Sequence, residues 1–248
     1  MPSVKPDHTG MLDKTKAKPG QLDNLFEQND VKKYNQCHGP GGKFCSGGGG
    51  GGGGSVTVGP SGAVYQTPAP KVEEPKGNPG NLTPEEFSAL KAYGREDYAV
   101  LNSRLRHEPY DKMPEKYQEM TKNMDSAFTK QTPLASDTKV FRGVNYGNAF
   151  GSAKPDSLVG KVIEDKGFMS TTTSVDVAGT FGSTRLNIVV PKGTKVVNMA
   201  QTLQSVAAKQ ERELLLPRGT KLQITHVAQT KGGFLGIGKE TFIEAKVV

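Results

Sequence analysis

The stretch AAKQERELLLPRGT (residues 207–220) places two glutamates, Glu211 and Glu213, two positions apart and directly before three leucines. Alternate side chains of a β-strand point to the same face, so a strand over residues 211–216 would present both carboxylates on one side. A solvated face or a helix start is the ordinary explanation for such a pair. The alternative is that both carboxylates serve a ligand at the point where a core begins.

The sequence around this stretch favours short strands. After Pro133, apolar residues recur with a period near two, and turns that contain proline or glycine separate the runs. The predicted strands are residues 139–144, 162–172, 185–190, 195–199, 211–216, 221–229 and 240–248.

The segment before these strands has a helical pattern. Thr83 is the expected N-cap of a first helix, with proline next and Glu86 three residues after the cap. This helix is predicted to pause near Gly94, and a second helix is predicted from Met113 to about Lys130. Helices followed by a run of strands indicate an α+β fold, with N-terminal helices packed on a mainly antiparallel two-sheet β core.

Residues 1–77 do not have the composition of a folded domain. Apolar residues are sparse, Gly47–Gly54 are eight consecutive glycines, and a proline-rich spacer follows. Such sequences cannot bury enough apolar surface to fold. The predicted division is a disordered tail and Gly/Pro-rich linker over 1–77 and one folded domain over 78–248.

Composition argues against several classes of protein. The net charge of +7 comes from scattered lysines and arginines, without the basic face of a nucleic-acid binder, so no nucleic-acid partner is expected. The two cysteines, Cys37 and Cys45, exclude a disulfide framework, and with His38 they lack the fourth ligand of a zinc site, so no metal is expected. No membrane-spanning run or signal peptide is present, which predicts a cytoplasmic protein without a membrane partner.

Three polar insertions interrupt the predicted strands. Arg142 lies between apolar residues and suits a phosphate or carboxylate, and Gly143 beside it would allow a ligand to approach the protein backbone closely. Ser170, Thr171 and Thr172 end an apolar strand, where their hydroxyls can brace a charged group. The third insertion is the glutamate pair. Taken one at a time, an arginine paired within the fold and ordinary strand-end hydroxyls are the simpler explanations.

In this order, the three insertions resemble the arginine-directed, toxin-like branch of the ADP-ribosyltransferase family, with its Arg / Ser-Thr-Ser / Glu-x-Glu signature. The matching stretches are FRGV, KGFMSTT and QERELLLPRGT, and YAVLNSRLR (98–106) is similar to the helix that closes the nicotinamide side of these domains. The resemblance covers about residues 80–248 and implies that 78–248 is a catalytic domain. Two departures are Thr172 in place of serine and the lack of an aromatic residue before the glutamates.

The resemblance implies a role for each carboxylate. Cleavage of the nicotinamide–ribose bond of NAD develops positive charge on the ribose, which Glu213 would stabilise while it holds the ribose 2′-hydroxyl. Glu211 would orient the incoming guanidinium and accept its proton, since free arginine has a pKa above about 12. The two carboxylates would thus interact with two different positive groups, the developing charge on the ribose and the arriving guanidinium.

The resemblance also implies an NAD-binding set. Arg142 would clamp the pyrophosphate or adjoining ribose, and Ser170 would hold Glu213 in place. Residues 174–185 would form a short helix and a loop over the cofactor, with Phe181 stacking on it. The full expected binding set is Arg142, Gly143, Ser170, Thr171, Thr172, Phe181 and Glu213.

The expected function is transfer of ADP-ribose from NAD to arginine side chains of bacterial host proteins, with release of nicotinamide. An NAD glycohydrolase, or a virion interaction module with an inactive domain, are the alternatives. The stretch YNQCHGPGGKFCSGGGG (34–50) is similar to a pattern in tailed-phage head proteins. That similarity predicts a phage or prophage enzyme, packaged in the virion and in contact with phage head components, with a plain linker as the alternative.

Overall fold

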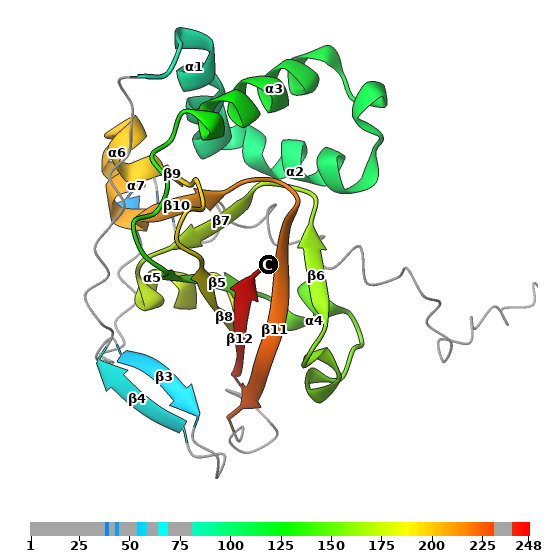
Figure 1. The fold of residues 1–248 in the computed structure, drawn as a ribbon, viewed down its shortest axis with the longest axis vertical. Helices are drawn as coiled ribbons and strands as arrows, with labels where there is room; N and C mark the ends of the chain where they lie inside the picture. The colour runs from blue at the N-terminus through cyan, green and yellow to red at the C-terminus, as the bar shows by residue number, and fades with distance from the viewer. Residues whose placement is uncertain (1–37, 40–42, 45–53, 59–63, 69–80, 231–239) are drawn as a thin grey trace, which may run out of the picture.

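The computed structural model describes most of the chain from residue 81 onward and the backbone of a few earlier segments. The described residues are 38–39, 43–44, 54–58, 64–68, 81–230 and 240–248 (Figure 1). Two short antiparallel hairpins that the sequence did not predict occur among the early segments: β1 (His38–Gly39) with β2 (Lys43–Phe44), and β3 (Gly54–Val58) with β4 (Val64–Pro68). The rest of the predicted tail, both cysteines and most of the phage-like stretch lie outside the described residues.

From residue 81 onward, helices come first and strands follow. The helical elements are α1 (Pro84–Ala92), η4 (Tyr93–Asp97), α2 (Tyr98–His107), η5 (Tyr110–Lys112), α3 (Glu115–Thr129), α4 (Tyr146–Phe150), η6 (Pro155–Leu158), α5 (Val175–Gly179), α6 (Met199–Leu203) and α7 (Val206–Glu211). The strands are β5 (Thr138–Val144), β6 (Val162–Asp165), β7 (Met169–Thr172), β8 (Thr184–Val190), β9 (Val197–Asn198), β10 (Glu213–Leu216), β11 (Thr220–Gln229) and β12 (Thr241–Val247).

These eight strands form one sheet in the order β6-β11-β12-β8-β5-β7-β10-β9. All neighbours are antiparallel except β12 and β8. Strands β5 and β7 share a single residue pair, Phe141 with Thr172. The sheet therefore consists of a large wing (β6-β11-β12-β8-β5) and a small wing (β7-β10-β9). The two wings correspond to the two sheets of the predicted, mainly antiparallel core, and the pair between β5 and β7 joins them.

The side chains of β10 alternate between two cores. Leu214 and Leu216 belong to the core formed between the wings, which β5, β8 and β12 also line. Leu215 belongs to a second core, beneath the helices. The three consecutive leucines are buried because this strand has an apolar layer on each face.

The helical layer covers the outer face of the small wing (Figure 1). Leu90, Leu101 and Met124, one from each of α1, α2 and α3, pack with Phe168 and Leu215. The predicted pause near Gly94 is confirmed, because five residues of π-helix separate α1 from α2. A Cβ atom on Gly94 would lie 3.0 Å from a Leu203 methyl group of α6, so close packing accompanies this irregular turn.

One predicted strand is two strands. The prediction of a continuous strand over residues 162–172 is wrong, because β6 and β7 lie in different wings and are separated by a turn. The Asp165 carboxylate accepts a hydrogen bond from the Gly167 N–H at 2.9 Å, which closes this turn. Glycine and a short acidic side chain are typical turn residues, so the break was readable in the sequence.

The stretch 207–220 also differs from its prediction. Glu211 is the last residue of α7, and only Glu213 lies on β10. Arg212 between them has φ 48° and ψ 43°, a left-handed conformation that ends the helix and turns the chain into the strand. The prediction that both glutamates share one strand face is therefore wrong.

Glu86 fixes α1 to α3 in addition to capping its own helix. Its carboxylate accepts hydrogen bonds from the Thr83 N–H at 2.8 Å, the Ser126 hydroxyl at 2.6 Å and Lys130 Nζ at 2.8 Å. Burial alone would raise the pKa of the Glu86 carboxyl, but the hydrogen bonds from Lys130, Ser126 and Thr83 lower it below its ordinary value. The charged form is therefore the one that stabilises the fold.

Glu86→Gln is expected to lower the free energy of unfolding by about 1–2 kcal/mol at neutral pH, because hydrogen bonds to a charged group are lost. A lowered folded-state pKa contributes stability above the unfolded pKa, and this contribution disappears as pH falls through the folded value. Urea unfolding should therefore show a difference in stability between wild type and variant at neutral pH, and this difference should shrink as the pH falls below the ordinary carboxyl pKa. Glu119→Gln, at an exposed position on α3, is the matched control and should change little.

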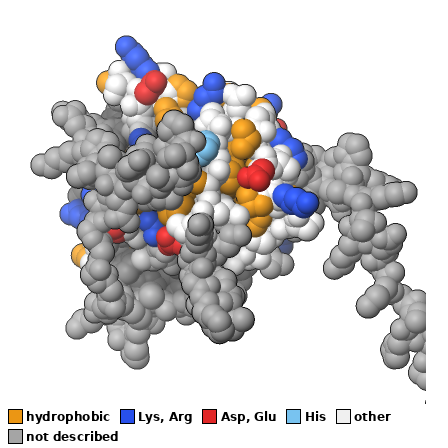
Figure 2. Space-filling model, turned by 90° about the horizontal axis from the view of Figure 1, so that it is seen from below, with side chains coloured by type: hydrophobic (Ala, Val, Ile, Leu, Met, Phe, Trp, Pro, Cys, Tyr) orange, Lys and Arg blue, Asp and Glu red, His pale blue; other side chains and the backbone are white. Residues whose placement is uncertain are grey.

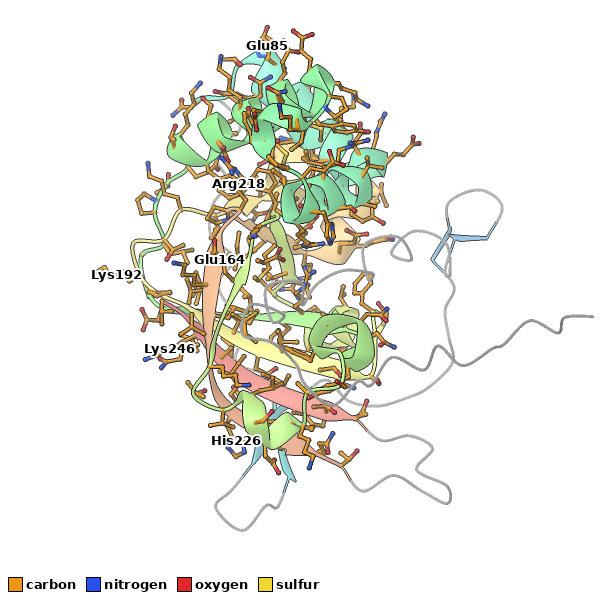
Figure 3. All side chains as sticks on the ribbon, turned by 90° about the vertical axis from the view of Figure 1, so that its right-hand side faces the viewer. Glu85, Glu164, Lys192, Arg218, His226 and Lys246 are labelled. Atoms are coloured by element: carbon orange, nitrogen blue, oxygen red, sulfur yellow. The ribbon has the colours of Figure 1, made fainter. Side chains whose placement is uncertain are left out.

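A surface ion pair joins the helical layer to the sheet. Arg218, at the junction of the helices and the sheet in Figure 3, donates from Nε to both Asp125 oxygens of α3, at 3.0 and 2.9 Å. Where the face in Figure 2 belongs to described residues, basic and acidic side chains are interspersed. Among the described helices, none is long and apolar enough to cross a bilayer.

Candidate active site

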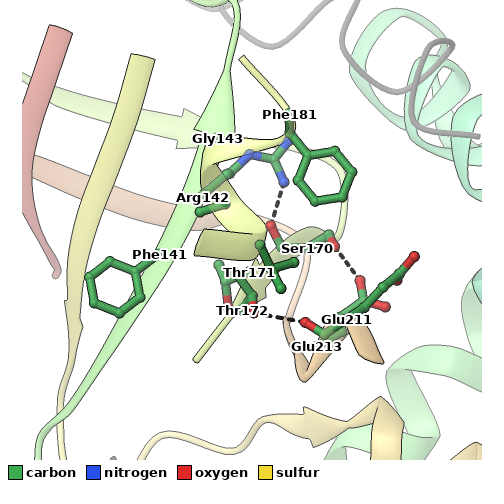
Figure 4. A pocket seen from close by; sticks show the side chains of 11 residues that line it. Phe141, Arg142, Gly143, Ser170, Thr171, Thr172, Phe181, Glu211 and Glu213 are labelled. Atoms are coloured by element: carbon green, nitrogen blue, oxygen red, sulfur yellow. Dashed lines mark hydrogen bonds between the residues drawn. The ribbon is translucent and has the colours of Figure 1, made fainter. Parts of the chain in front are cut away.

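A pocket lies where the two wings meet, beneath helix α5 (Figure 4). It is lined by Phe141, Arg142, Gly143, Ser170, Thr171, Thr172, Val177, Ala178, Phe181, Glu211 and Glu213. Every site residue predicted from the sequence is in this set. The structure thus brings the three polar insertions together although they are distant in sequence.

Glu213 is held by a hydroxyl from the neighbouring strand. Strands β7 and β10 pair so that Glu213 lies opposite Thr172, and the Ser170 hydroxyl donates a hydrogen bond to Glu213 Oε1 (Figure 4). Glu213 is 5% exposed. A buried carboxylate with a fixed hydroxyl partner has little freedom to reorient, so its negative charge has a fixed place in the pocket.

Arg142 reaches the same strand from the large wing. It lies on β5, is 7% exposed, and donates from its guanidinium to the Ser170 backbone carbonyl at 2.7 Å. The single pair that joins the wings, Phe141 with Thr172, is adjacent to it. Ser170 therefore contacts the arginine through its carbonyl and Glu213 through its hydroxyl, and it links a fixed cation to a fixed anion.

Glu211 enters the pocket from the end of α7 and is half-buried. The Thr172 hydroxyl donates to the Glu211 backbone carbonyl at 2.7 Å and accepts from the Ser174 N–H at 3.0 Å. Thr172 thus fixes the helix end through the backbone of Glu211. Since Glu211 and Glu213 come from different elements, the pocket receives two carboxylates from two directions.

Thr171 braces the strand pair itself. Its hydroxyl donates to the Leu214 carbonyl of β10 at 2.5 Å, and the side chain is 3% exposed. The three hydroxyls of the predicted Ser-Thr-Thr motif therefore have three separate bonding partners, and only Ser170 bonds directly to a carboxylate.

Gly143 has a packing role that the sequence did not indicate. The sequence predicts that this glycine lets a ligand approach, but the nearest atom to an added Cβ is the Ala178 carbonyl oxygen of α5, at 1.8 Å. Helix α5 therefore packs against the backbone of β5 at this position. Because Gly143 has no side chain, α5 can pack close to β5 and form one wall of the pocket.

Gly143→Ala is expected to destabilise the fold by about 1–3 kcal/mol, because the added methyl group overlaps backbone atoms and α5 must move. Thermal or urea unfolding measures this loss. The matched control is Gly147→Ala in α4, where the nearest atom to an added Cβ is 3.5 Å away and little change is expected. Equal stability of the two variants would contradict the packing argument.

The predicted short helix in segment 174–185 is α5, and a loop follows it up to residue 183. The last two residues of the segment, 184–185, begin β8 and are not part of the loop. Phe181 lines the pocket, as the prediction of a stacking residue requires. Val177 and Ala178 also line it, and neither was predicted from the sequence. Small apolar residues in a short helix do not indicate a binding site in a sequence, and Val177 and Ala178 reach the pocket only because α5 packs on Gly143.

No cluster of three or more metal-ligating side chains occurs among the described residues. The stretch 98–106, singled out in the sequence, forms most of α2, and none of its residues lines the pocket. It contacts the turn before β7 instead, through Asn102.

Comparison with curated proteins finds two bacterial relatives. The chain is 30% identical over 152 residues to the NAD(+)–arginine ADP-ribosyltransferase EFV of Enterococcus faecalis, covering 58% of this chain and 29% of the relative. It is 29% identical over 157 residues to the secreted exoenzyme S of Pseudomonas aeruginosa, covering 62% of this chain and 32% of the relative. The chain thus matches less than a third of the length of each.

Solved structures share the fold. Plx2a, an ADP-ribosyltransferase toxin from Paenibacillus larvae, superposes with a TM-score of 0.58 at 23% identity, covering 68% of this chain and 88% of that one. Exoenzyme S from P. aeruginosa, solved with human 14-3-3 protein beta and carba-NAD, gives 0.54 at 24% identity, covering 68% and 76%. The model of the ADP-ribosyltransferase exoenzyme family matches residues 72–246, well over half of the sequence. The chain therefore belongs to the ADP-ribosyltransferase exoenzyme family.

Proposed function

We propose that residues 78–248 are a catalytic domain that transfers ADP-ribose from NAD to arginine side chains of proteins and releases nicotinamide. The observation that carries this proposal is the hydrogen bond from Ser170 to the buried Glu213, next to Arg142 in one pocket. A fixed carboxylate beside a fixed cation suits a substrate that carries a phosphate group and develops positive charge as it reacts.

NAD provides both features. In the proposed complex, Arg142 binds the pyrophosphate or adjoining ribose, and Phe181 packs against the cofactor. Glu213 lies beside the ribose of the nicotinamide end and accepts a hydrogen bond from its 2′-hydroxyl. As the bond to nicotinamide breaks, the ribose becomes oxocarbenium-like, and the negative charge of Glu213 stabilises it.

The acceptor enters on the side of Glu211. An arginine nitrogen forms a bond to the ribose C1′, nicotinamide leaves with the electrons of the broken bond, and the guanidinium proton passes to Glu211. A protonated guanidinium is not nucleophilic and has a pKa above about 12, so a carboxylate at the point of attack has a defined task. The half-buried position of Glu211, at the end of a helix and on the pocket lining, supports this role.

The E. faecalis relative is an NAD(+)–arginine ADP-ribosyltransferase by name, which supports arginine as the acceptor and NAD as the donor. A bacterial host protein as target, action in the host cytoplasm, and packaging with phage head components stay predictions. The last of these rests on residues 34–50 alone.

The test is incubation of the full chain with labelled NAD and a bacterial lysate, followed by mass spectrometry of modified proteins. Transfer to arginine predicts hydroxylamine-sensitive ADP-ribose adducts and stoichiometric nicotinamide release. Release of nicotinamide without adducts would instead identify an NAD glycohydrolase. Absence of both products would favour an inactive interaction module.

A further inference from the structure

Helix α2 carries two buried polar side chains that face the turn between β6 and β7. Asn102 is 1% exposed and Arg106 is 6% exposed. Neither lines the pocket or has a part in the chemistry proposed above. Burial of an amide or a guanidinium is costly unless its polar atoms are bonded, so their partners indicate which part of the chain they hold.

Asn102 pairs with both backbone polar groups of Phe168. Its Oδ1 accepts from the Phe168 N–H at 2.8 Å, and its Nδ2 donates to the Phe168 carbonyl at 3.2 Å. Nδ2 also donates to the Tyr93 hydroxyl at 2.9 Å, and that hydroxyl donates to the same carbonyl at 3.3 Å. The Asn102 side chain thus makes the two backbone hydrogen bonds that a neighbouring strand would otherwise make with residue 168.

The turn fits this amide closely. A Cβ atom on Gly167 would lie 2.7 Å from Asn102 Oδ1, so only glycine leaves room for the bonds. Arg106 holds the other end of the turn, since its Nε and one terminal nitrogen donate to the two oxygens of Asp165 at 2.9 and 3.0 Å. Both ends of the turn are therefore fixed to α2.

The position of this turn determines the position of Ser170. Phe168 is two residues before Ser170, and its ring is stacked on Phe128 at 5.8 Å, with 5° between the planes. A strand advances about 3.3 Å per residue, so a displacement of the Phe168 backbone moves the Ser170 hydroxyl along β10 and away from Glu213. A misplacement of about 1 Å in a catalytic group can cost on the order of 100-fold in rate.

We infer that Asn102 is a positioning residue for NAD cleavage: by holding the backbone of Phe168, it sets the Ser170 hydroxyl against the Glu213 carboxylate. This inference rests on the proposed function of Glu213. Asn102 touches no reacting atom, and its whole effect passes through Ser170.

The test is a double-mutant cycle between Asn102→Ala and Ser170→Ala. Asn102→Ala alone should lower kcat for NAD cleavage about tenfold, with KM for NAD within about twofold of wild type. In the Ser170→Ala background, the same substitution should cost less than about twofold, because the hydroxyl that it positions is gone. Equal losses in both backgrounds, or no loss in the wild type, would overturn the inference.

Stability is controlled in two ways. Glu86→Gln is the matched variant, since it weakens the helical layer without contacting the turn and should leave kcat unchanged. Asn102→Asp is the second variant in case the alanine variant does not fold, because it preserves size and the acceptor for the Phe168 N–H. Its second oxygen faces the Phe168 carbonyl in place of a donor, so it should show the same dependence on Ser170.

A structure of a folded Asn102 variant separates failure of this inference from failure of the proposed function. The Ser170 hydroxyl should then lie beyond hydrogen-bond distance of Glu213, whether or not the wild type cleaves NAD. A Ser170–Glu213 hydrogen bond that persists in the variant would overturn the inference even in an active enzyme. If the bond is broken in the variant but the wild type does not cleave NAD, only the proposed function is overturned.

Discussion

Glu213→Gln should lower kcat for NAD cleavage by about 10²–10³-fold, because one preorganised electrostatic interaction with the transition state is removed. Glutamine has nearly the same size and can still accept the Ser170 hydroxyl hydrogen bond, so the fold and the pocket should persist. Only the negative charge is lost, and that charge is most effective when the ribose is most positive. The loss should therefore appear in kcat, with KM for NAD little changed.

Nicotinamide release measured by chromatography gives both constants. The matched control is Glu164→Gln, the same change at an exposed position of β6 in the large wing, which should leave both constants unchanged. Full NAD turnover by the Glu213 variant would remove this residue from the chemistry. A rise in KM alone would mean that Glu213 only binds the ground state.

Glu211→Gln should separate the two halves of the reaction. Transfer to an arginine-containing peptide should fall by about 100-fold or more, because the guanidinium loses the base that accepts its proton. Hydrolysis of NAD should remain within about threefold of wild type, since water needs no such carboxylate to attack an oxocarbenium-like ribose. The assay is parallel measurement of labelled peptide and released nicotinamide.

Gln210→Ala, one residue earlier on α7 and exposed, is the control and should affect neither product. Equal losses of transfer and hydrolysis in the Glu211 variant would contradict separate roles for the two carboxylates. Unchanged transfer would assign the proton to another acceptor and leave Glu211 as a wall of the pocket.

Much of the fold was readable from local chemistry. Thr83 and Glu86 form the predicted capping box, and the change of period after Pro133 marks the change from helices to strands. The family resemblance carried by the three polar insertions implied that Arg142 and Glu213 would share a site, and both line the pocket.

Other features depend on interactions that no local pattern records. Arg212 adopts a left-handed conformation without being glycine, so the end of α7 between the two glutamates was invisible in the sequence. Position 143 must be glycine because the backbone of Ala178, 35 positions away in the chain, packs directly against it. Asn102 is the hydrogen-bonding partner of the turn before β7, a role that the sequence of its helix did not indicate.

In the proposed function, Arg142, Ser170 and Glu213 form one pocket for NAD at the junction of the two wings. A crystal structure of the Glu213→Gln variant with NAD tests it most directly, since the variant should bind the intact cofactor and cleave it slowly. The pyrophosphate or adjoining ribose is expected at Arg142, and the nicotinamide ribose is expected within hydrogen-bond distance of residue 213. NAD bound elsewhere, or in this pocket with its nicotinamide ribose away from residue 213, would contradict it.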